Sequence, residues 1–236
     1  MALSNITGVV SIALEAEERL RALPRTSMRT VRRLRREFSQ RLSNAPSFVL
    51  REIASLLLFQ PGLKFRLFAY ELLGNSDDAL FSLRPCDLSQ LAIGIDSRSS
   101  ADAFALAIVG PLWRERRIPE DLMHSWAKSG SRWWKRIAVV SAINQVQINR
   151  TGPKIDSRNL KVLKIALADR SADVVTGLVA ALRPLLRSNF AAARELFESL
   201  GIANHPALRR LLRRRQRGPL GRRSSQKREA LLAHIA

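Results

Sequence analysis

Apolar residues recur along most of the chain at intervals of three and four, the spacing that gathers side chains on one face of an α-helix. The pattern predicts helices at 5–23, 27–42, 46–59, 63–73, 86–95, 100–114, 119–128, 131–148, 157–168, 173–187, 189–200 and 204–216, and a short one at 225–235. Proline or glycine stands where several of these segments end, as Pro24 and Gly62 do. No segment alternates apolar and polar residues over the length of a strand, so the sequence predicts an all-α protein.

One kind of helix recurs in this pattern, with small residues in its middle and apolar residues at its end. The segments 64–73, 100–108, 135–143 and 174–183 are of this kind. Their centres are roughly 33 to 42 residues apart, which is the period of two-helix repeat proteins. Stacked helix pairs form a curved slab with a concave face, so we expect a helical solenoid. An irregular helical bundle is the alternative.

The composition adds a strong positive charge to this picture. Forty Lys and Arg residues against twenty Asp and Glu give the 236-residue chain a formal net charge of +20. Nine arginines lie between Arg19 and Arg41, and ten basic residues follow Asn204. Nucleic acid is the usual partner of so basic a chain, and an anionic membrane surface is the next. We expect one helical domain over 1–216 and a basic tail over 217–236.

Several classes of chemistry lack the residues they need. The lone Cys86 excludes an internal disulfide and is typical of the reducing cytoplasm. The three histidines His124, His205 and His234 are far apart, so we expect no metal and no cofactor. The longest apolar run, 103–113, is about half the roughly 20 residues that a bilayer requires. We therefore expect a cytoplasmic, nucleoid-associated protein, monomeric, without a membrane partner.

The segment 126–143 holds three of the four tryptophans beside adjacent cations, a combination that can grip a polyanion. Its residues follow the spacing W-x-x-S-x-x-x-W-x-R-R-x-A, with Lys in place of the first Arg: Trp126, Ser129, Trp133, Lys135, Arg136 and Ala138. This spacing resembles the signature of the bacterial DNA alkylation repair family, the HEAT-like-repeat alkylpurine DNA glycosylases. The segment 65–73 and the run 181–183 are also similar to that family. The resemblance covers about residues 45–200.

The resemblance implies a HEAT-like solenoid whose concave basic face holds double-stranded DNA, alkylated or structurally distorted. Residues on the matching helices would then contact the DNA: Arg136, Lys135, Trp133, Arg132, Arg66, Lys64, Arg183 and Arg187. In the family, two tryptophans and one aspartate around the lesion's sugar assist the excision of cationic N3- or N7-alkylated purines. Trp126 is expected to be a packing residue, with Trp133 and Trp134 on different sides of their helix.

The sequence departs from the family where the catalytic residues belong. Ala101 and Ala180 stand at the two tryptophan positions and Ala105 at the aspartate position. Asp102 is the remaining candidate for a catalytic carboxylate, and its other possible role is to cap the start of its helix. We therefore predict a DNA-binding family member that has lost its glycosylase residues. The alternatives are an active alkylpurine glycosylase and a non-enzymatic scaffold that binds an acidic protein.

Overall fold

The computed structural model describes residues 2–23, 27–144, 147–149, 152–154, 156–168 and 171–188, together with Glu198 and Pro206. The helices are α1 (Ala2–Arg21), α2 (Met28–Arg41), α3 (Ser47–Leu58), α4 (Leu63–Gly74), α5 (Asp77–Phe81), α6 (Pro85–Leu91), α7 (Arg98–Phe104), the π-helix η1 (Ala105–Val109), α8 (Gly110–Arg114), α9 (Glu120–Lys128), α10 (Arg132–Asn144), α11 (Ser157–Leu167) and α12 (Ala172–Ser188). Apart from Glu198 and Pro206, the helices expected after residue 188 and the tail 217–236 lie outside these residues.

The all-α class is confirmed, with one local difference. The helix expected over 131–148 ends at Asn144, and a hairpin of two three-residue strands follows, β1 (Gln147–Asn149) and β2 (Gly152–Lys154). Ile148 lies opposite Pro153 in this antiparallel pair. Gly152 and Pro153 are poor helix residues, because glycine costs backbone entropy and proline lacks an N–H donor. These two residues explain why the apolar pattern does not continue the helix.

A short helix that the pattern missed, α5, owes its start to its cap. The Ser76 hydroxyl accepts a hydrogen bond from the Ala79 backbone N–H, and Asp77 and Asp78 occupy the first turn. Acidic residues are favourable at a helix N-terminus, where the backbone N–H groups are unpaired. The cap residues were therefore a usable signal, although five residues are too few to show a helical period.

The helix predicted over 100–114 is a continuous run of α7, η1 and α8 with a π turn in its middle. The backbone N–H of Gly110 donates to the Ala105 carbonyl, a span of five residues. Pro111 accounts for the irregularity, because it has no N–H and its ring would clash with the Ala107 carbonyl in a regular α-helix. Gly74 of α4 packs against that carbonyl so closely that it leaves no space for a Cβ.

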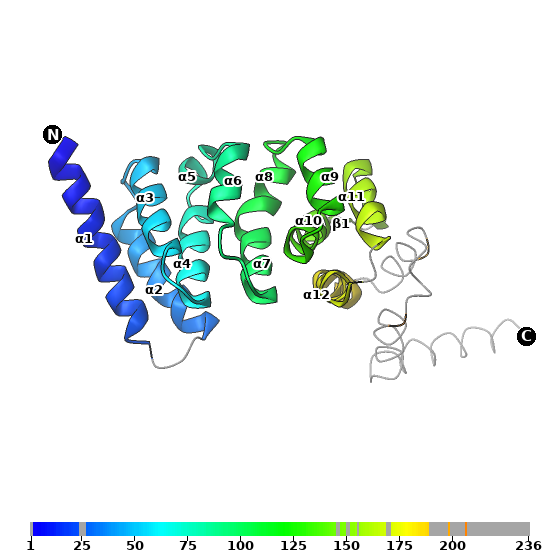
Figure 1. The fold of residues 1–236 in the computed structure, drawn as a ribbon, viewed down its shortest axis with the longest axis horizontal. Coiled ribbons are helices and arrows are strands. Elements are labelled where there is room, and N and C mark those ends of the chain that lie inside the picture. Colours follow the sequence, from blue (N-terminus) through cyan, green and yellow to red (C-terminus); the bar gives the residue numbers. More distant parts are fainter. Residues whose placement is uncertain are drawn as a thin grey trace, which may run out of the picture.

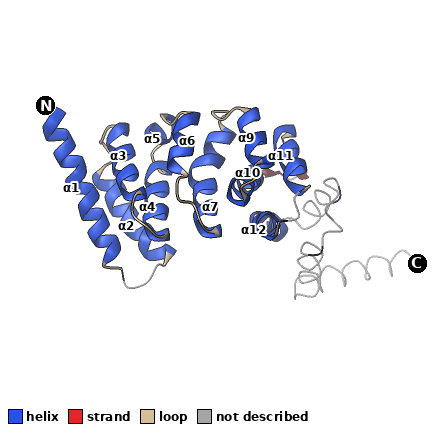
Figure 2. Cartoon of the chain, in the orientation of Figure 1, coloured by secondary structure: helices blue, strands red, loops and turns tan. Residues whose placement is uncertain are grey.

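The helices follow one another in sequence order along the longest axis, from α1 at one end toward α11 and α12 at the other (Figure 1). Figure 2 shows that helices form almost all of the described fold. Within it, α2 packs against α4, α4 against α7, α7 against α10, and α10 against α12, and we call these five helices the α2–α12 layer. In a second row, α1 packs against α3, α3 against α5, and α9 against α11.

Aromatic side chains of neighbouring helices in the α2–α12 layer pack against each other in the core. Phe38 and Phe68 meet edge-on with ring centroids 5.5 Å apart, and Tyr70 lies 5.1 Å from Phe104. The Tyr70 hydroxyl donates to the Leu91 carbonyl at 2.8 Å, and burial raises the pKa of Tyr70 to about 12. Each fully buried aromatic or leucine side chain contributes about 1.5–3 kcal/mol. The core therefore fixes the helices of the α2–α12 layer, and with them the side chains on the surface of that layer.

Candidate nucleic-acid interface

A groove of about 650 Å³ opens on the α2–α12 layer. Its lining comes mainly from α2, α4 and the continuous α7–η1 helix, and α4 packs against both of the others. Met28 and Leu106 are exposed apolar residues of the lining, and Asp102 is a charged one. Glu71, also in the lining, pairs with Arg32 at 2.7 Å and so ties α2 to α4.

Five charged residues from three helices of this layer meet beside the groove, and we call them the Arg–Asp cluster: Arg98, Asp102, Arg132, Arg136 and Asp173. Arg98 and Asp102 lie four residues apart on α7, and Arg132 and Arg136 lie four apart on α10, so each pair shares one helix face. The packing of α7 on α10 and of α10 on α12 brings these faces together with Asp173. The cluster carries three positive charges and two negative ones.

Arg136 is the most enclosed member, with 3% of its side chain exposed. Its Nε and Nη2 donate to the two carboxylate oxygens of Asp102, both at 2.7 Å. Its Nη1 donates to the Asp173 backbone carbonyl at 2.6 Å and to Thr176 Oγ1 at 3.0 Å. Gly177 leaves room for the guanidinium, since a Cβ there would lie 3.2 Å from Nη1. Arg136 thus links three helices, a different placement from the phosphate-facing cation expected from the sequence.

Asp173 holds the two exposed arginines of the cluster. Arg98 Nε donates to Oδ1 at 2.6 Å, and Arg132 Nη1 lies 3.2 Å from Oδ2. The Asp173 carboxylate is 12% exposed, whereas the Arg98 and Arg132 side chains are 53% and 62% exposed. The hydrogen bond from Arg98, helped by the nearby positive charges, lowers the pKa of Asp173 despite its partial burial. A charged carboxylate therefore fixes two guanidinium groups that stay open to solvent.

The tryptophans of 126–143 mainly support α10. Trp126 is buried and stacks on Trp134 with ring centroids 4.6 Å apart, and Trp134 meets Phe104 edge-on at 6.5 Å. Trp133 is on another side of the helix, where the Arg132 guanidinium lies 4.5 Å from its ring centroid. Trp126 is thus a packing residue, as expected, and Trp133 braces one of the exposed arginines of the cluster.

Three of the other predicted DNA-contacting residues, Arg66, Lys64 and Lys135, are not members of this cluster. Arg66 is buried and donates to a backbone carbonyl in the loop after α6, at 2.8 Å. Lys64 is half-buried on α4, and its Nζ lies 5.5 Å from the ring centroid of Phe65. Lys135 is half-buried on α10. Arg183 and Arg187 belong to α12, but their side chains lie outside the described residues.

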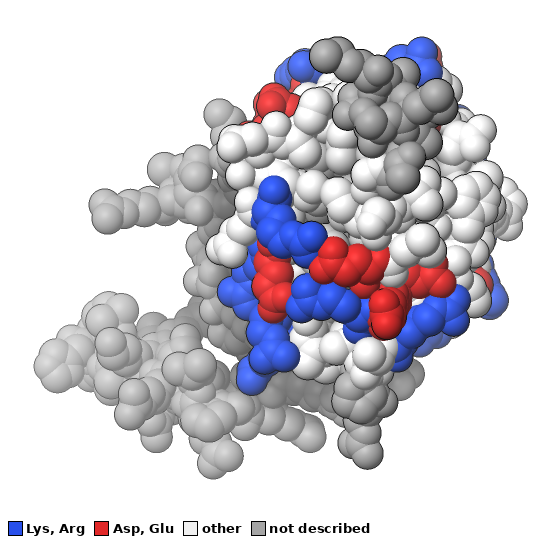
Figure 3. Space-filling model, turned by 90° about the vertical axis from the view of Figure 1, so that its left-hand side faces the viewer, with Lys and Arg blue, Asp and Glu red and all other residues white. Residues whose placement is uncertain are grey.

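Part of the basic N-terminal segment is paired with acids. Figure 3 shows blue and red side chains alternating in a band across the α1 end of the molecule. We call six of the residues at this end the α1–α2 ladder: Glu15, Glu17, Arg19, Arg21, Glu37 and Arg41. Arg41 binds both carboxylate oxygens of Glu15, at 2.6 and 2.9 Å, and Arg21 lies 2.7 Å from Glu17. The ladder has three charges of each sign.

The positions that resemble the family's catalytic residues offer little chemistry. Ala101 and Ala105 are fully buried, and Ala180 is an exposed residue of α12. The idea that Asp102 caps its helix is wrong, because the helix begins at Arg98 and Ser97 caps it. The Ser97 hydroxyl accepts from the Ser100 backbone N–H at 3.3 Å. Asp102 instead lines the groove with its carboxylate bound to Arg136.

Sequence reasoning missed two members of the cluster, Arg98 and Asp173. The four-residue spacing from Arg98 to Asp102 indicated one shared helix face, and this was a usable signal. Asp173 gave no signal of its own, since it lies 75 residues from Arg98 along the chain. It reads from the sequence as an acidic residue in a helix's first turn.

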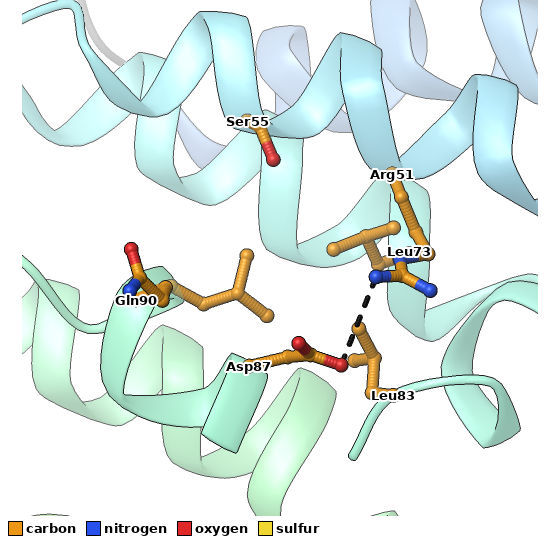
Figure 4. A pocket seen from close by; sticks show the side chains of 7 residues that line it. Arg51, Ser55, Leu73, Leu83, Asp87 and Gln90 are labelled. Carbon is orange, nitrogen blue, oxygen red and sulfur yellow. Dashed lines mark ion pairs between the residues drawn. The ribbon is translucent and has the colours of Figure 1, made fainter. Parts of the chain in front are cut away.

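A smaller cleft of about 220 Å³ lies on the other row of helices, between α3 and α6. Figure 4 shows Arg51 of α3 and Asp87 of α6 pointing toward each other across it, and their nearest charged atoms are 3.7 Å apart. The Asp87 carboxylate also accepts from the Arg84 backbone N–H at 2.8 Å. The Arg84 guanidinium lies 3.5 Å from the other Asp87 oxygen, so this one acid pairs with two arginines, of which Arg51 lines the cleft.

Two further features limit the chemistry of the described part of the chain. Among these residues, no three His, Cys, Asp or Glu side chains come together in a way that could hold a metal ion. None of the helices there is both long and apolar enough to cross a membrane.

Comparison with known proteins places the chain in a family. The family of DNA alkylation repair enzymes matches residues 26–215, which include the groove, the Arg–Asp cluster and the tryptophan segment. No curated protein and no solved structure matches the chain. The match covers more than half of the sequence and confirms the family that the tryptophan spacing indicated. The chain belongs to the DNA alkylation repair enzyme family.

Proposed function

We propose that this protein binds double-stranded DNA along the α2–α12 layer and no longer excises alkylated bases. The observation that carries the proposal is the ion pair of Asp102 with Arg136, made by two hydrogen bonds of 2.7 Å. Asp102 is the acid nearest to the family's catalytic position, one helical turn before Ala105. A buried guanidinium already neutralises its charge.

Family membership and charge both support a DNA partner. The chain has a formal net charge of +20, and Arg98 and Arg132 are exposed beside the groove. Arginines that contact phosphates supply affinity and register without reading base sequence. We therefore infer binding to the backbone and shape of duplex DNA, including alkylated or distorted DNA, rather than recognition of a particular sequence.

The loss of catalysis follows from what excision requires. As the glycosidic bond of a cationic alkylpurine breaks, positive charge on the base and sugar has to be stabilised by electron-rich rings or a carboxylate. Alanine at 101, 105 and 180 provides neither group. Removing one such electrostatic group typically lowers a rate by about 10²–10³. Removal of all three leaves the bond with little help from the protein.

A salt titration tests the DNA-binding part of the proposal. Anisotropy of a labelled duplex of about 20 base pairs should give a Kd that rises steeply with NaCl, with a log–log slope of about 0.9 per phosphate contacted. A vesicle of anionic lipid and an acidic protein serve as the competing ligands. Failure to bind the duplex at low salt, with binding to either competitor, would show that the partner is not DNA.

Base release tests the catalytic part. We expect 7-methylguanine and 3-methyladenine to leave methylated DNA at the uncatalysed rate in the presence of the protein. Release well above that rate, lost in Asp102→Asn, would identify an active glycosylase with Asp102 as its catalyst. Glu15→Gln is the matched control, because it is the same acid-to-amide change in a carboxylate that also binds an arginine with both oxygens, far from the groove.

A further inference from the structure

We propose that Arg98 and Arg132 form a clamp for one phosphodiester of DNA, and that Asp173 is the positioning residue that holds the clamp open. This inference rests on the proposed DNA binding and names the place where a phosphate is held. Neither the family match nor the spacing of the tryptophan segment assigns a role to Arg98 or Asp173. The two arginines come from neighbouring helices, α7 and α10, and share one carboxylate on a third, α12.

The first argument is the number of donors left over. A guanidinium has five N–H groups, and its planar fork matches the oxygens of a phosphate. Arg98 uses its Nε for Asp173 at 2.6 Å, and Arg132 brings Nη1 within 3.2 Å. Both side chains are more than half exposed. Donors on two guanidinium groups are therefore available to a ligand that arrives from solvent.

The second argument is preorganisation. An exposed arginine normally loses side-chain entropy when it binds, and a residue that already holds it in place reduces that cost. Asp173 restrains both arginines, and the Trp133 ring lies against Arg132 at 4.5 Å. Asp173 is itself fixed, since Arg136 donates to its backbone carbonyl at 2.6 Å. The clamp is therefore set in position before a ligand binds.

The third argument is the local charge balance. The Arg–Asp cluster has three arginines and two aspartates, and Arg136 and Asp102 neutralise each other in a closed pair. Arg98 and Arg132 then face one carboxylate and keep an excess of one positive charge. A phosphodiester carries one negative charge, so a single DNA phosphate completes the balance. The six residues of the α1–α2 ladder carry three charges of each sign, so they have no excess positive charge for a phosphate to balance.

The test measures duplex binding against NaCl for Arg98→Gln, Arg132→Gln and the double variant, with Arg41→Gln of the ladder as a control of equal charge change. Each clamp variant should weaken binding about tenfold at low salt. The double variant should reduce the log–log salt slope by about 0.9, the loss of one phosphate contact, and neither single variant should exceed this loss. A loss of about 1.8 in the double variant would mean two separate phosphate contacts and would overturn the shared clamp. Arg41→Gln should keep the slope of the unmodified protein.

Asp173→Asn separates positioning from bulk charge. This change raises the net charge by one, so a simple cation count predicts tighter DNA binding. The clamp predicts binding about threefold weaker, because asparagine offers the two guanidinium groups one neutral acceptor oxygen in place of two charged ones. Tighter binding by Asp173→Asn would overturn the positioning role. Circular dichroism checks that each variant keeps its helicity. If the Gln variants lose helicity, Arg98→Lys and Arg132→Lys replace them. These lysine variants should bind DNA more weakly with an unchanged salt slope.

The outcomes distinguish the clamp from the broader proposal. If the unmodified protein does not bind duplex DNA, the proposed function fails. If it binds with a steep salt slope that the double variant leaves unchanged, the clamp fails while DNA binding stands. Inorganic phosphate and a free mononucleotide at equal ionic strength are added as competitors. We expect neither to displace the duplex, and displacement by the mononucleotide would assign the clamp to small phosphates.

Discussion

Two arginine–carboxylate pairs in this molecule have nearly the same geometry and different surroundings. Arg41 binds Glu15 with two hydrogen bonds of 2.6 and 2.9 Å, and Arg136 binds Asp102 with two of 2.7 Å. The side chain of Arg41 is 50% exposed at the α1 end, whereas that of Arg136 is enclosed between α7, α10 and α12. Water competes for the first pair and is excluded from much of the second. Equal contacts therefore have unequal energetic weight.

The regions around these pairs differ in charge as well as in burial. In the α1–α2 ladder each of the three arginines has an acidic partner, so these six residues leave no local excess of charge. In the Arg–Asp cluster three arginines face two aspartates, and two of the arginines are more than half exposed. The availability of a cation to DNA therefore depends on which acids the fold brings beside it.

The largest effect should come from removing the buried arginine. We expect Arg136→Met to lower the free energy of unfolding by about 3 kcal/mol, because it leaves the Asp102 carboxylate and the Asp173 carbonyl without their donor. Arg41→Met should cost less than about 1 kcal/mol. Urea unfolding followed by circular dichroism measures both. Equal losses of stability in the two variants would contradict the difference between the buried and the exposed pair. The double variant Arg136→Met with Asp102→Leu should recover part of the lost free energy of unfolding, because it removes the unpaired carboxylate as well.

Most of the fold could be predicted from the apolar period, and the failures have local causes. Helices over 63–73 and 119–128 were predicted within a residue or two of α4 and α9. The hairpin after Asn144 was missed because its strands have three residues each, too few to show alternation. The π turn was missed because a period of 3.6 over 100–114 does not reveal one inserted residue.

The site was predictable only in part, because burial and pairing are tertiary properties. The tryptophan spacing led to α10 and to Arg132 and Arg136, but it could not show which of the two is enclosed. The enclosure of Arg136 depends on Asp102 from one helix and on Gly177 from another. No local pattern joins residues so distant in sequence. Only the fold showed that Arg132, which lies against the Trp133 ring, also pairs with Asp173.

A smaller effect should distinguish two helical glycines. Gly177 lies against Arg136, where a Cβ would be 3.1 Å from Cγ, whereas nothing lies within 4 Å of a Cβ at Gly8 in α1. Hydrogen bonds to Asp102 and to the Asp173 carbonyl hold the Arg136 guanidinium in place. Gly177→Ala should therefore lower the free energy of unfolding by about 1 kcal/mol, net of its gain in helix propensity. Gly8→Ala should instead add up to about 1 kcal/mol. Thermal unfolding compares them, and stabilisation of both variants would show that Arg136 is free to shift.

The smallest effect is the response of the ladder to acid and salt. The hydrogen bond from Arg41 lowers the pKa of Glu15, so the carboxylate's contribution to stability is complete above its unfolded pKa of about 4.3 and is lost as pH falls through the lower folded value. Glu15→Gln should therefore be less stable than the unmodified protein at pH 7 by less than about 1 kcal/mol, and the difference should vanish once the pH falls below the lowered folded pKa. Unfolding is measured across this range at low and high NaCl. High salt should abolish the Glu15→Gln difference, because exposed charges are screened. A difference that persists in salt would mean that the α1 end is as shielded as the Arg–Asp cluster.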